Sequence, residues 1–218
     1  MTVRTNSGLL MAMQSVLAAA KTITIVNTGT DTITAVGHGY SNGDVVLLEI
    51  DSIRDLDKTP FEVMNVATDT FQLVGPDGTT ALDMSTMSAL GAGTATAKKV
   101  TLGISITGVQ DFSPSGGDIE FRDTTTVMDT RKTQVVSGVS AMSYALTLQW
   151  DPANAGQAAM KAAYEARASK VFKITWPDGA YAMWYGTVGY SGAPGGGNQE
   201  NTTTQAAIAV SGNLTVSA

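Results

Sequence analysis

Few residues in this sequence could carry out catalysis. The chain of 218 residues has one histidine, His38, and no cysteine. Histidine chemistry is therefore limited to one site, and disulfides and thiolate metal sites are excluded. His38 lies in a Gly-His-Gly sequence typical of a turn. Gly37, Gly39 and Gly43 miss the dinucleotide-binding spacing by one residue, and no helical pattern follows them. We interpret His38 as a turn residue.

A second candidate is the acidic cluster formed by Asp51, Asp55 and Asp57. Carboxylates at short spacing can bind calcium, but the spacing and the glycine of an EF-hand loop are absent here, and Pro60 interrupts the stretch. A solvated acidic loop is the better interpretation.

The third candidate is the pair Asp118 and Glu120, which lie one residue apart on an expected strand. Alternation places both on one face, where a solvated surface explains them without chemistry. With no phosphate-binding Gly-Lys-Ser/Thr motif either, the sequence predicts a protein without enzymatic activity, cofactor or metal.

The composition indicates a β-rich protein. Apolar residues make up 43% of the chain and charged residues 15%, with 23 glycines and many Thr, Ser and Val residues. The net charge of −6 argues against a protein that grips nucleic acid by its phosphates. The charge is uneven, since residues 22–98 hold three basic and ten acidic residues (net −7) and the remainder ten and nine (net +1).

Alternation with period two recurs along the second half of the chain and predicts half-buried strands. The alternating stretches are Val100–Ile106, Tyr144–Trp150, Phe172–Trp176 and Ile208–Val216. This pattern places Trp150 and Trp176 inward. Pro177-Asp178-Gly179 predicts a tight turn, because proline presets φ and glycine accepts a positive φ.

One helix is expected between Asp151 and Ser169, with Asp151 as its cap and Pro152 in its first turn. One face is rich in alanine, which predicts close packing on a sheet. That face comprises Ala155, Ala159, Ala162, Ala163 and Ala166, with Met160 and Tyr164 beside it.

Residues 22–98 form a second unit of short expected strands, separated by turns rich in Gly, Asn and Asp. These strands are Thr22–Val26, Thr32–Val36, Val45–Ile50, Phe61–Val66 and Thr70–Val74. The domain prediction is one β domain from residues 1–21 and 99–218, with residues 22–98 inserted. The segments 111–138 and 191–205 are expected to be mobile loops.

The first element is ambiguous. Residues 9–20 have apolar side chains at helical spacing, yet a strand-like sequence follows. The same stretch imitates a signal peptide, but Gln14 breaks it, and we expect a packed element of a protein that is not exported. No apolar run approaches the roughly 20 residues needed to span a bilayer, so we expect no membrane contact.

An ordered set of segments resembles a known family. From Ile104 onward these are Val109–Asp118, Asp123–Asp129, Trp150-Asp151-Pro152, Ala155–Met160, Phe172–Gly179 and Tyr185–Val188. This order is similar to the tail tube proteins of siphophages, the lambda-like group included. An earlier set, Val36–Gly39, Asn42–Val46 and Asp69–Leu73, resembles an insertion in one branch of that family.

The resemblance implies a mainly β fold: a tail-tube β-sandwich or barrel flanked by one α-helix, with an inserted small β unit. It implies a strand at residues 8–15. Six copies would form a ring whose inner sheets join into a barrel, and stacked rings would conduct DNA from capsid to host. The implied partners are further copies of the chain, the tail terminator, the tape measure and the tail tip proteins. DNA would pass without specific binding, and the location would be the virion tail, after assembly in the host cytoplasm.

Segment 111–138 is too long and polar to be idle in a compact domain, so we expect it to contact a neighbouring subunit or ring. The expected contact residues are Asp111, Phe112, Asp123, Thr124, Thr125, Thr126, Asp129, Arg131 and Lys132. Candidates for a mildly negative channel wall are Asp118, Glu120 and Asp123. The acidic unit 22–98 is expected on the outer face, because six copies facing inward would crowd like charges in the channel.

The alternative is a carbohydrate-binding surface module of a phage or bacterium. Its sugar platform would be built from aromatic side chains at Trp150, Trp176, Tyr181, Trp184, Tyr185 and Tyr190. The inward direction expected for Trp150 and Trp176 argues against this alternative.

Overall fold

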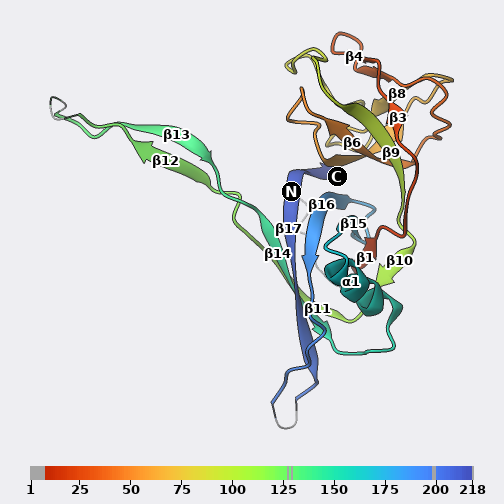
Figure 1. The fold of residues 1–218 in the computed structure, drawn as a ribbon, viewed down its shortest axis with the longest axis vertical. Helices are drawn as coiled ribbons and strands as arrows, with labels where there is room; N and C mark the ends of the chain where they lie inside the picture. Colours follow the sequence, from red (N-terminus) through yellow and green to blue (C-terminus); the bar gives the residue numbers. More distant parts are fainter. Residues whose placement is uncertain (1–7, 127, 129, 198–199, 218) are drawn as a thin grey trace.

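The structure is a computed structural model that describes residues 8–126, 128, 130–197 and 200–217. Within these residues the chain forms one helix and three sheets (Figure 1). The largest body is a curled sheet with the strand order β10-β1-β15-β16-β17-β14-β11. Its strands are β1 (Leu10–Met13), β10 (Ile104–Ile106), β11 (Val109–Ser115), β14 (Ser143–Gln149), β15 (Ser169–Thr175), β16 (Tyr181–Gly189) and β17 (Thr203–Ser217). The predicted mainly β fold with one helix is confirmed.

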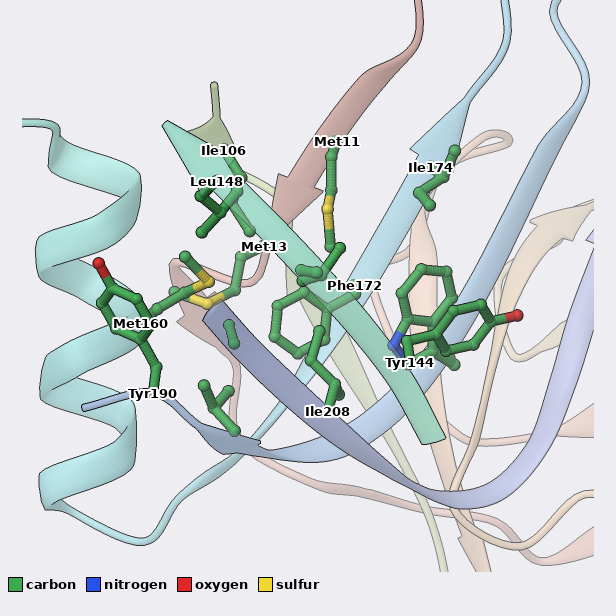
Figure 2. Packing of buried hydrophobic residues seen from close by; sticks show 14 of the residues in the cluster. Met11, Met13, Ile106, Tyr144, Leu148, Met160, Phe172, Ile174, Tyr190 and Ile208 are labelled. Atoms are coloured by element: carbon green, nitrogen blue, oxygen red, sulfur yellow. The ribbon is translucent and has the colours of Figure 1, made fainter. Parts of the chain in front are cut away.

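The curled sheet closes around one hydrophobic core (Figure 2). Trp184 is fully buried at its centre and stacks on Tyr144, with 4.3 Å between the ring centroids, and on Phe172. The alternating residues Tyr144, Leu146 and Leu148 of β14 all point into this core. Period-two patterning therefore determined which face of these strands is buried.

Trp150 is an exception to the expected alternation. It follows the end of β14, is 36% exposed, and its Nε1 donates a hydrogen bond to the carbonyl oxygen of Gly192. The prediction that Trp150 points inward is wrong, because the pleat that alternates side chains ends one residue earlier. Trp176 is half-buried and packs against the core. The turn after it forms as predicted, with Gly179 at φ 91°.

The helix α1 (Ala155–Glu165) begins later than the sequence suggested. Its N-cap is Asn154, whose Oδ1 accepts hydrogen bonds from the backbone N–H groups of Gly156 and Gln157. Asp151 instead accepts a hydrogen bond from the N–H of Ala153 in a turn before the helix. The predicted cap at Asp151 is therefore wrong.

The buried face of α1 is also displaced from the expected alanine face. Its buried residues are Gly156, Gln157, Met160 and Ala163. Close packing on the sheet does occur, but through Gly156, where an added Cβ would lie 2.5 Å from the carbonyl oxygen of Ser105. Tyr164 is 45% exposed.

The ambiguous first element is a strand. β1 lies between β10 and β15, and its backbone pairs with both. Met11 and Met13 point into the core. The implied strand at residues 8–15 is confirmed over Leu10–Met13, because pairing on both edges outweighs the helical spacing of the apolar residues.

A second body, the eight-stranded unit, runs from Val16 to Thr101. Its strands are β2 (Val16–Leu17), β3 (Lys21–Thr22), β4 (Ile25–Asn27), β5 (Thr32–Thr34), β6 (Val45–Ile50), β7 (Thr59–Met64), β8 (Thr70–Leu73) and β9 (Ala95–Thr101). β9 pairs with β2, β3 and β6, so the strands that enter and leave the unit belong to its sheet. The unit has its own core around Phe71 and Leu48.

The eight-stranded unit is tightly docked on the curled sheet. A third apolar cluster joins them, with Val45, Leu47 and Val100 from the unit and Val171, Tyr181 and Met183 from the sheet. Lys173 forms an ion pair with Glu62 at 3.3 Å. In β17, Asn213 donates hydrogen bonds from its backbone N–H to Thr59 Oγ1 and from its Nδ2 to the carbonyl oxygen of Asp55.

The prediction that residues 111–138 form a loop is wrong. This segment contains most of β11 and the strands β12 (Ile119–Asp123) and β13 (Gln134–Val139), which pair only with each other. In the other expected loop, 191–205, the described residues are mostly irregular and include an isolated bridge between Gly195 and Thr203, where β17 begins. Among the described residues, the single helix has 11 residues and is too short to cross a membrane.

Candidate assembly surfaces

The most conspicuous feature is the hairpin formed by β12 and β13, here called the arm (Figure 1). It continues the pairing of β11 with β14 but extends away from both the curled sheet and the eight-stranded unit. All residues of β12 are exposed. At its base Gly116 and Gly117 both have positive φ, and an added Cβ at Gly116 would overlap the carbonyl oxygen of Ala141. This pair of glycines allows the ribbon to bend away from the sheet.

The register of the arm separates an apolar face from a mostly polar one, which carries Glu120, Arg122 and the exposed Val135. Ile119 lies opposite Val139 and Phe121 opposite Val136, and a bulge between Glu120 and Phe121 keeps the four side chains on one face. All four are between 56% and 66% exposed. The sequence analysis missed this face, although the alternation in Ile-Glu-Phe-Arg-Asp could have indicated it.

Local hydrogen bonds hold the arm in shape. Thr124 donates its backbone N–H to the carbonyl oxygen of Thr133, and Asp118 and Ser140 are hydrogen bonded across the base. Asp123 accepts from the backbone N–H of Thr125, and the hydrogen bonds from Thr125 lower the pKa of Asp123 below its ordinary value. Such bonds shape the hairpin but leave its apolar face uncovered.

The predicted contact residues therefore divide between two places. Asp111 and Phe112 lie in β11 on the curled sheet, and Phe112 is half-buried against the core. The arm and its end carry Asp123, Thr124, Thr125, Thr126, Arg131 and Lys132, all exposed. Asp129 lies outside the described residues. Asp118 is at the base of the arm and Glu120 is on its polar face.

The acidic residues of the eight-stranded unit are mostly engaged in local structure. Asp51 accepts a hydrogen bond from the N–H of Thr94, and Asp57 accepts one from the N–H of Ile50. Hydrogen bonds from Thr80 and Thr79 lower the pKa of Asp77 to about 2. Within the described residues, no group of three or more Asp, Glu or His side chains could hold a metal ion.

His38 is buried in the core of the eight-stranded unit. Its Nδ1 accepts a hydrogen bond from the N–H of Tyr40, and its ring packs against Tyr40 and Phe71. The interpretation as a turn residue accounts for its flanking glycines, both with positive φ. Its Nε2 is buried and has no hydrogen-bond partner among the described residues.

The aromatic residues do not form a sugar platform. Tyr181, Trp184 and Tyr190 are buried. Trp176 and Tyr185 are half-buried, and Trp150 alone of the six reaches 36% exposure. A platform needs several exposed rings in one plane, so this arrangement gives no support to carbohydrate binding.

Taken together, the curled sheet, the helix α1 and the exposed arm define a mainly β protein with an apolar surface that suits a protein contact. The phage tail tube protein family matches residues 51–218, and the chain belongs to that family. No curated protein matches the chain. The chain is thus a structural component of the phage virion tail that assembles with copies of itself and with other tail components.

Proposed function

We propose that this chain is the major tail tube protein of a long, non-contractile siphophage tail. Six copies form a ring, rings stack into a tube, and DNA passes through that tube from capsid to host. The protein has no enzymatic activity. The observation that carries the proposal is the arm, whose apolar face is left exposed by all residues of the subunit that the structure describes.

The arm is poorly suited to exposure to solvent. A two-stranded hairpin is marginally stable on its own, and this one exposes Ile119, Phe121, Val136 and Val139 on one side. Burying such side chains stabilises a contact by roughly 25 cal/mol per Å² of apolar surface. A neighbouring copy of the chain, in the same or the next ring, is the partner that a self-assembling protein supplies.

The free edges of the curled sheet support the same proposal. Its outermost strands are β10 and β11, and neither pairs with another strand on its outer side within the described residues. Open edges invite association with other chains, and a closed ring removes them. Ring formation would therefore give hydrogen-bond partners to the backbone groups on the outer edge of β11, which has seven residues.

The acidic unit belongs, in this proposal, on the outer surface of the tube. With a net charge of −7 at residues 22–98, an inward position would repel DNA and the other copies, whereas outward charges are screened by salt within about 10 Å. The division into residues 1–21 and 99–218 against 22–98 is part of this proposal. The assignment of Asp118, Glu120 and Asp123 to the channel wall is a separate prediction.

The remaining partners follow from the same role. The tube would meet a tail terminator, a tape measure protein and tail tip proteins, and would assemble in the host cytoplasm before it becomes part of the virion. DNA would pass without specific binding.

Electron microscopy of the purified protein tests the proposal. We expect the wild-type chain to form six-fold rings or open tubes. Phe121→Ser should abolish tubes, because it removes the largest side chain from the apolar face of the arm. Arg122→Ser, on the opposite face of the same strand, is the matched control and should assemble. A wild-type chain that stays strictly monomeric at high concentration refutes the proposal.

A further inference from the structure

A groove, here called the helix groove, lies along the exposed side of α1. It has a volume of about 420 Å³, and the residues that line it include Trp150, Pro152, Ala158, Lys161 and Ala162. A second hollow of about 440 Å³ shares Trp150 and Pro152 with it, so the two are continuous. Because the alanine side chains of α1 are small and exposed, the groove has room for bulkier apolar side chains from outside the subunit.

The polar groups along the helix groove are already hydrogen bonded within the subunit. The indole Nε1 of Trp150 donates to the carbonyl oxygen of Gly192, and the Tyr190 hydroxyl donates to Gln157 Oε1. Gln157 in turn donates from Nε2 to the carbonyl oxygen of Gln149. Apolar side chains that cover these groups would therefore leave none of these donors unpaired.

The arm and the helix groove lie at opposite ends of β14. The arm ends at Val139, shortly before β14 begins at Ser143, and Trp150 directly follows the end of β14 at Gln149. The seven residues of β14 span roughly 20 Å, and the arm extends away from the curled sheet (Figure 1). The arm is thus directed away from the groove of its own subunit. Two matching surfaces at opposite ends of one chain make a head-to-tail contact, which builds rings or open stacks.

We infer that the apolar face of the arm of one copy lies in the helix groove of another copy. This inference rests on the proposed function and names the surface that the arm contacts. Phe121 and Val136 would cover the exposed ring of Trp150 and the alanines of α1, so apolar surface on both copies is removed from water in one contact. Aromatic side chains such as those of Phe121 and Trp150 dominate the energetics of such interfaces.

Charged side chains beside the two surfaces are complementary. Asp123 follows Phe121 by two residues in β12, so it lies at the outer end of the apolar face. Lys161 lines the groove and forms no ion pair or hydrogen bond with any residue that the structure describes. Glu165 also lines the groove, and the exposed Lys132 at the end of the arm is its counterpart. A pair between Asp123 of one copy and Lys161 of another would set the register of the arm. Asp123 would then be a contact residue and not a channel-wall residue.

Cross-linking of assembled tubes tests the contact, because the chain has no cysteine of its own. The variant Val136→Cys with Ala162→Cys has one thiol on the apolar face of the arm and one in the groove. The matched control, Val135→Cys with Ala162→Cys, moves the first thiol to the opposite face of the arm. A short bis-maleimide joins thiols that face each other without the strict geometry of a disulfide. Val139→Cys with Ala158→Cys samples the same contact if the first variant does not assemble.

In tubes of the first variant, each copy should be joined to two others, and a denaturing gel should show a ladder of covalent oligomers. The control should stay largely monomeric. Tubes without a ladder, or an equal ladder in the control, would overturn the inference and leave the proposed function standing. A ladder from Val136→Cys with Val216→Cys, at the exposed apolar end of β17, but not with Ala162→Cys would place the arm on another surface and overturn it too. Absence of wild-type tubes would instead refute the proposed function.

A charge exchange tests the register of the arm without cross-linking. Lys161→Glu and Asp123→Lys should each slow the growth of tubes about tenfold at low ionic strength, because a like-charged pair opposes the encounter. The combination of both substitutions restores an oppositely charged pair and should grow faster than either single variant. Asp118→Lys, at the base of the arm, should not rescue Lys161→Glu. A combined variant that grows as slowly as Lys161→Glu alone would overturn the inference.

Discussion

The hydroxyl of Thr215 donates a hydrogen bond of 2.6 Å to the carbonyl oxygen of Pro60, and the Thr215 side chain is buried. These residues lie 155 positions apart, in the last strand of the curled sheet and in β7 of the eight-stranded unit. The contact shows that the acidic unit is not attached by its two connecting strands alone. It packs against the end of β17 and fixes it.

Thr215→Val should lower the free energy of unfolding by about 1–2 kcal/mol, because the carbonyl of Pro60 would lose a buried partner. Thr204→Val is the matched control. Thr204 lies in the same strand and is buried, but its Oγ1 has no partner among the described residues. The control should be neutral or stabilising in urea denaturation. Equal losses in both variants would show that the hydrogen bond does not matter.

Gly212→Ala should destabilise the chain by about 3 kcal/mol and loosen the eight-stranded unit. The backbone at Gly212 has φ 81°, and an added Cβ would lie 2.5 Å from the carbonyl oxygen of Lys58. Gly179→Ala separates the cost of the positive φ from the cost of the steric overlap. Gly179 has φ 91°, but no atom lies within 4 Å of the added Cβ. That control should lose only about 1 kcal/mol. Similar thermal shifts in both variants would contradict a close approach at Gly212.

Alkaline pH should weaken the junction between the two bodies. Burial, then the nearby charge of Glu62, raises the pKa of Tyr181 to about 12. A phenol whose pKa is higher in the folded state contributes stability below its unfolded pKa of about 10, and this contribution is lost as the pH rises toward 12. Tyr181→Phe should therefore reduce the loss of unfolding free energy between about pH 10 and pH 12 by up to about 2 kcal/mol. Equal slopes for the wild-type chain and Tyr181→Phe over this pH range in urea denaturation would contradict the expectation.

The arm should change its hydrogen exchange on assembly. In free subunits its backbone hydrogen bonds are exposed to solvent, and we expect the amides of β12 and β13 to exchange fast. In tubes a neighbouring copy covers the apolar face, and the same amides should become strongly protected. The amides of β16, in the centre of the curled sheet, should be protected in both states. Equal exchange of the arm in both states would mean that it does not take part in assembly.

Local sequence determined much of this architecture. Alternation in β14, β15 and the first part of β17 gave the correct buried face because the side-chain period of a strand is independent of what it packs against. The predicted inward position of Val216 is wrong: it is 46% exposed, and Thr215 and Ser217 beside it are buried, because the eight-stranded unit covers the other face of β17 there. Pro177-Asp178-Gly179 fixed a turn through φ preferences alone. The order of segments after Ile104 led to the correct family.

Tertiary structure decided what depends on distant partners. β1 is a strand because β10 and β15 pair with it from both sides, which its helical spacing could not reveal. The close approach of Gly156 to β10 determines which face of α1 is buried, and the alanine-rich face does not. Segment 111–138 has the polar composition of a loop. Its strands form because they pair with residues too distant in the sequence for a local pattern to reveal. Pairing and packing at long range add free energies that local propensities of a few tenths of a kcal/mol per residue cannot outweigh.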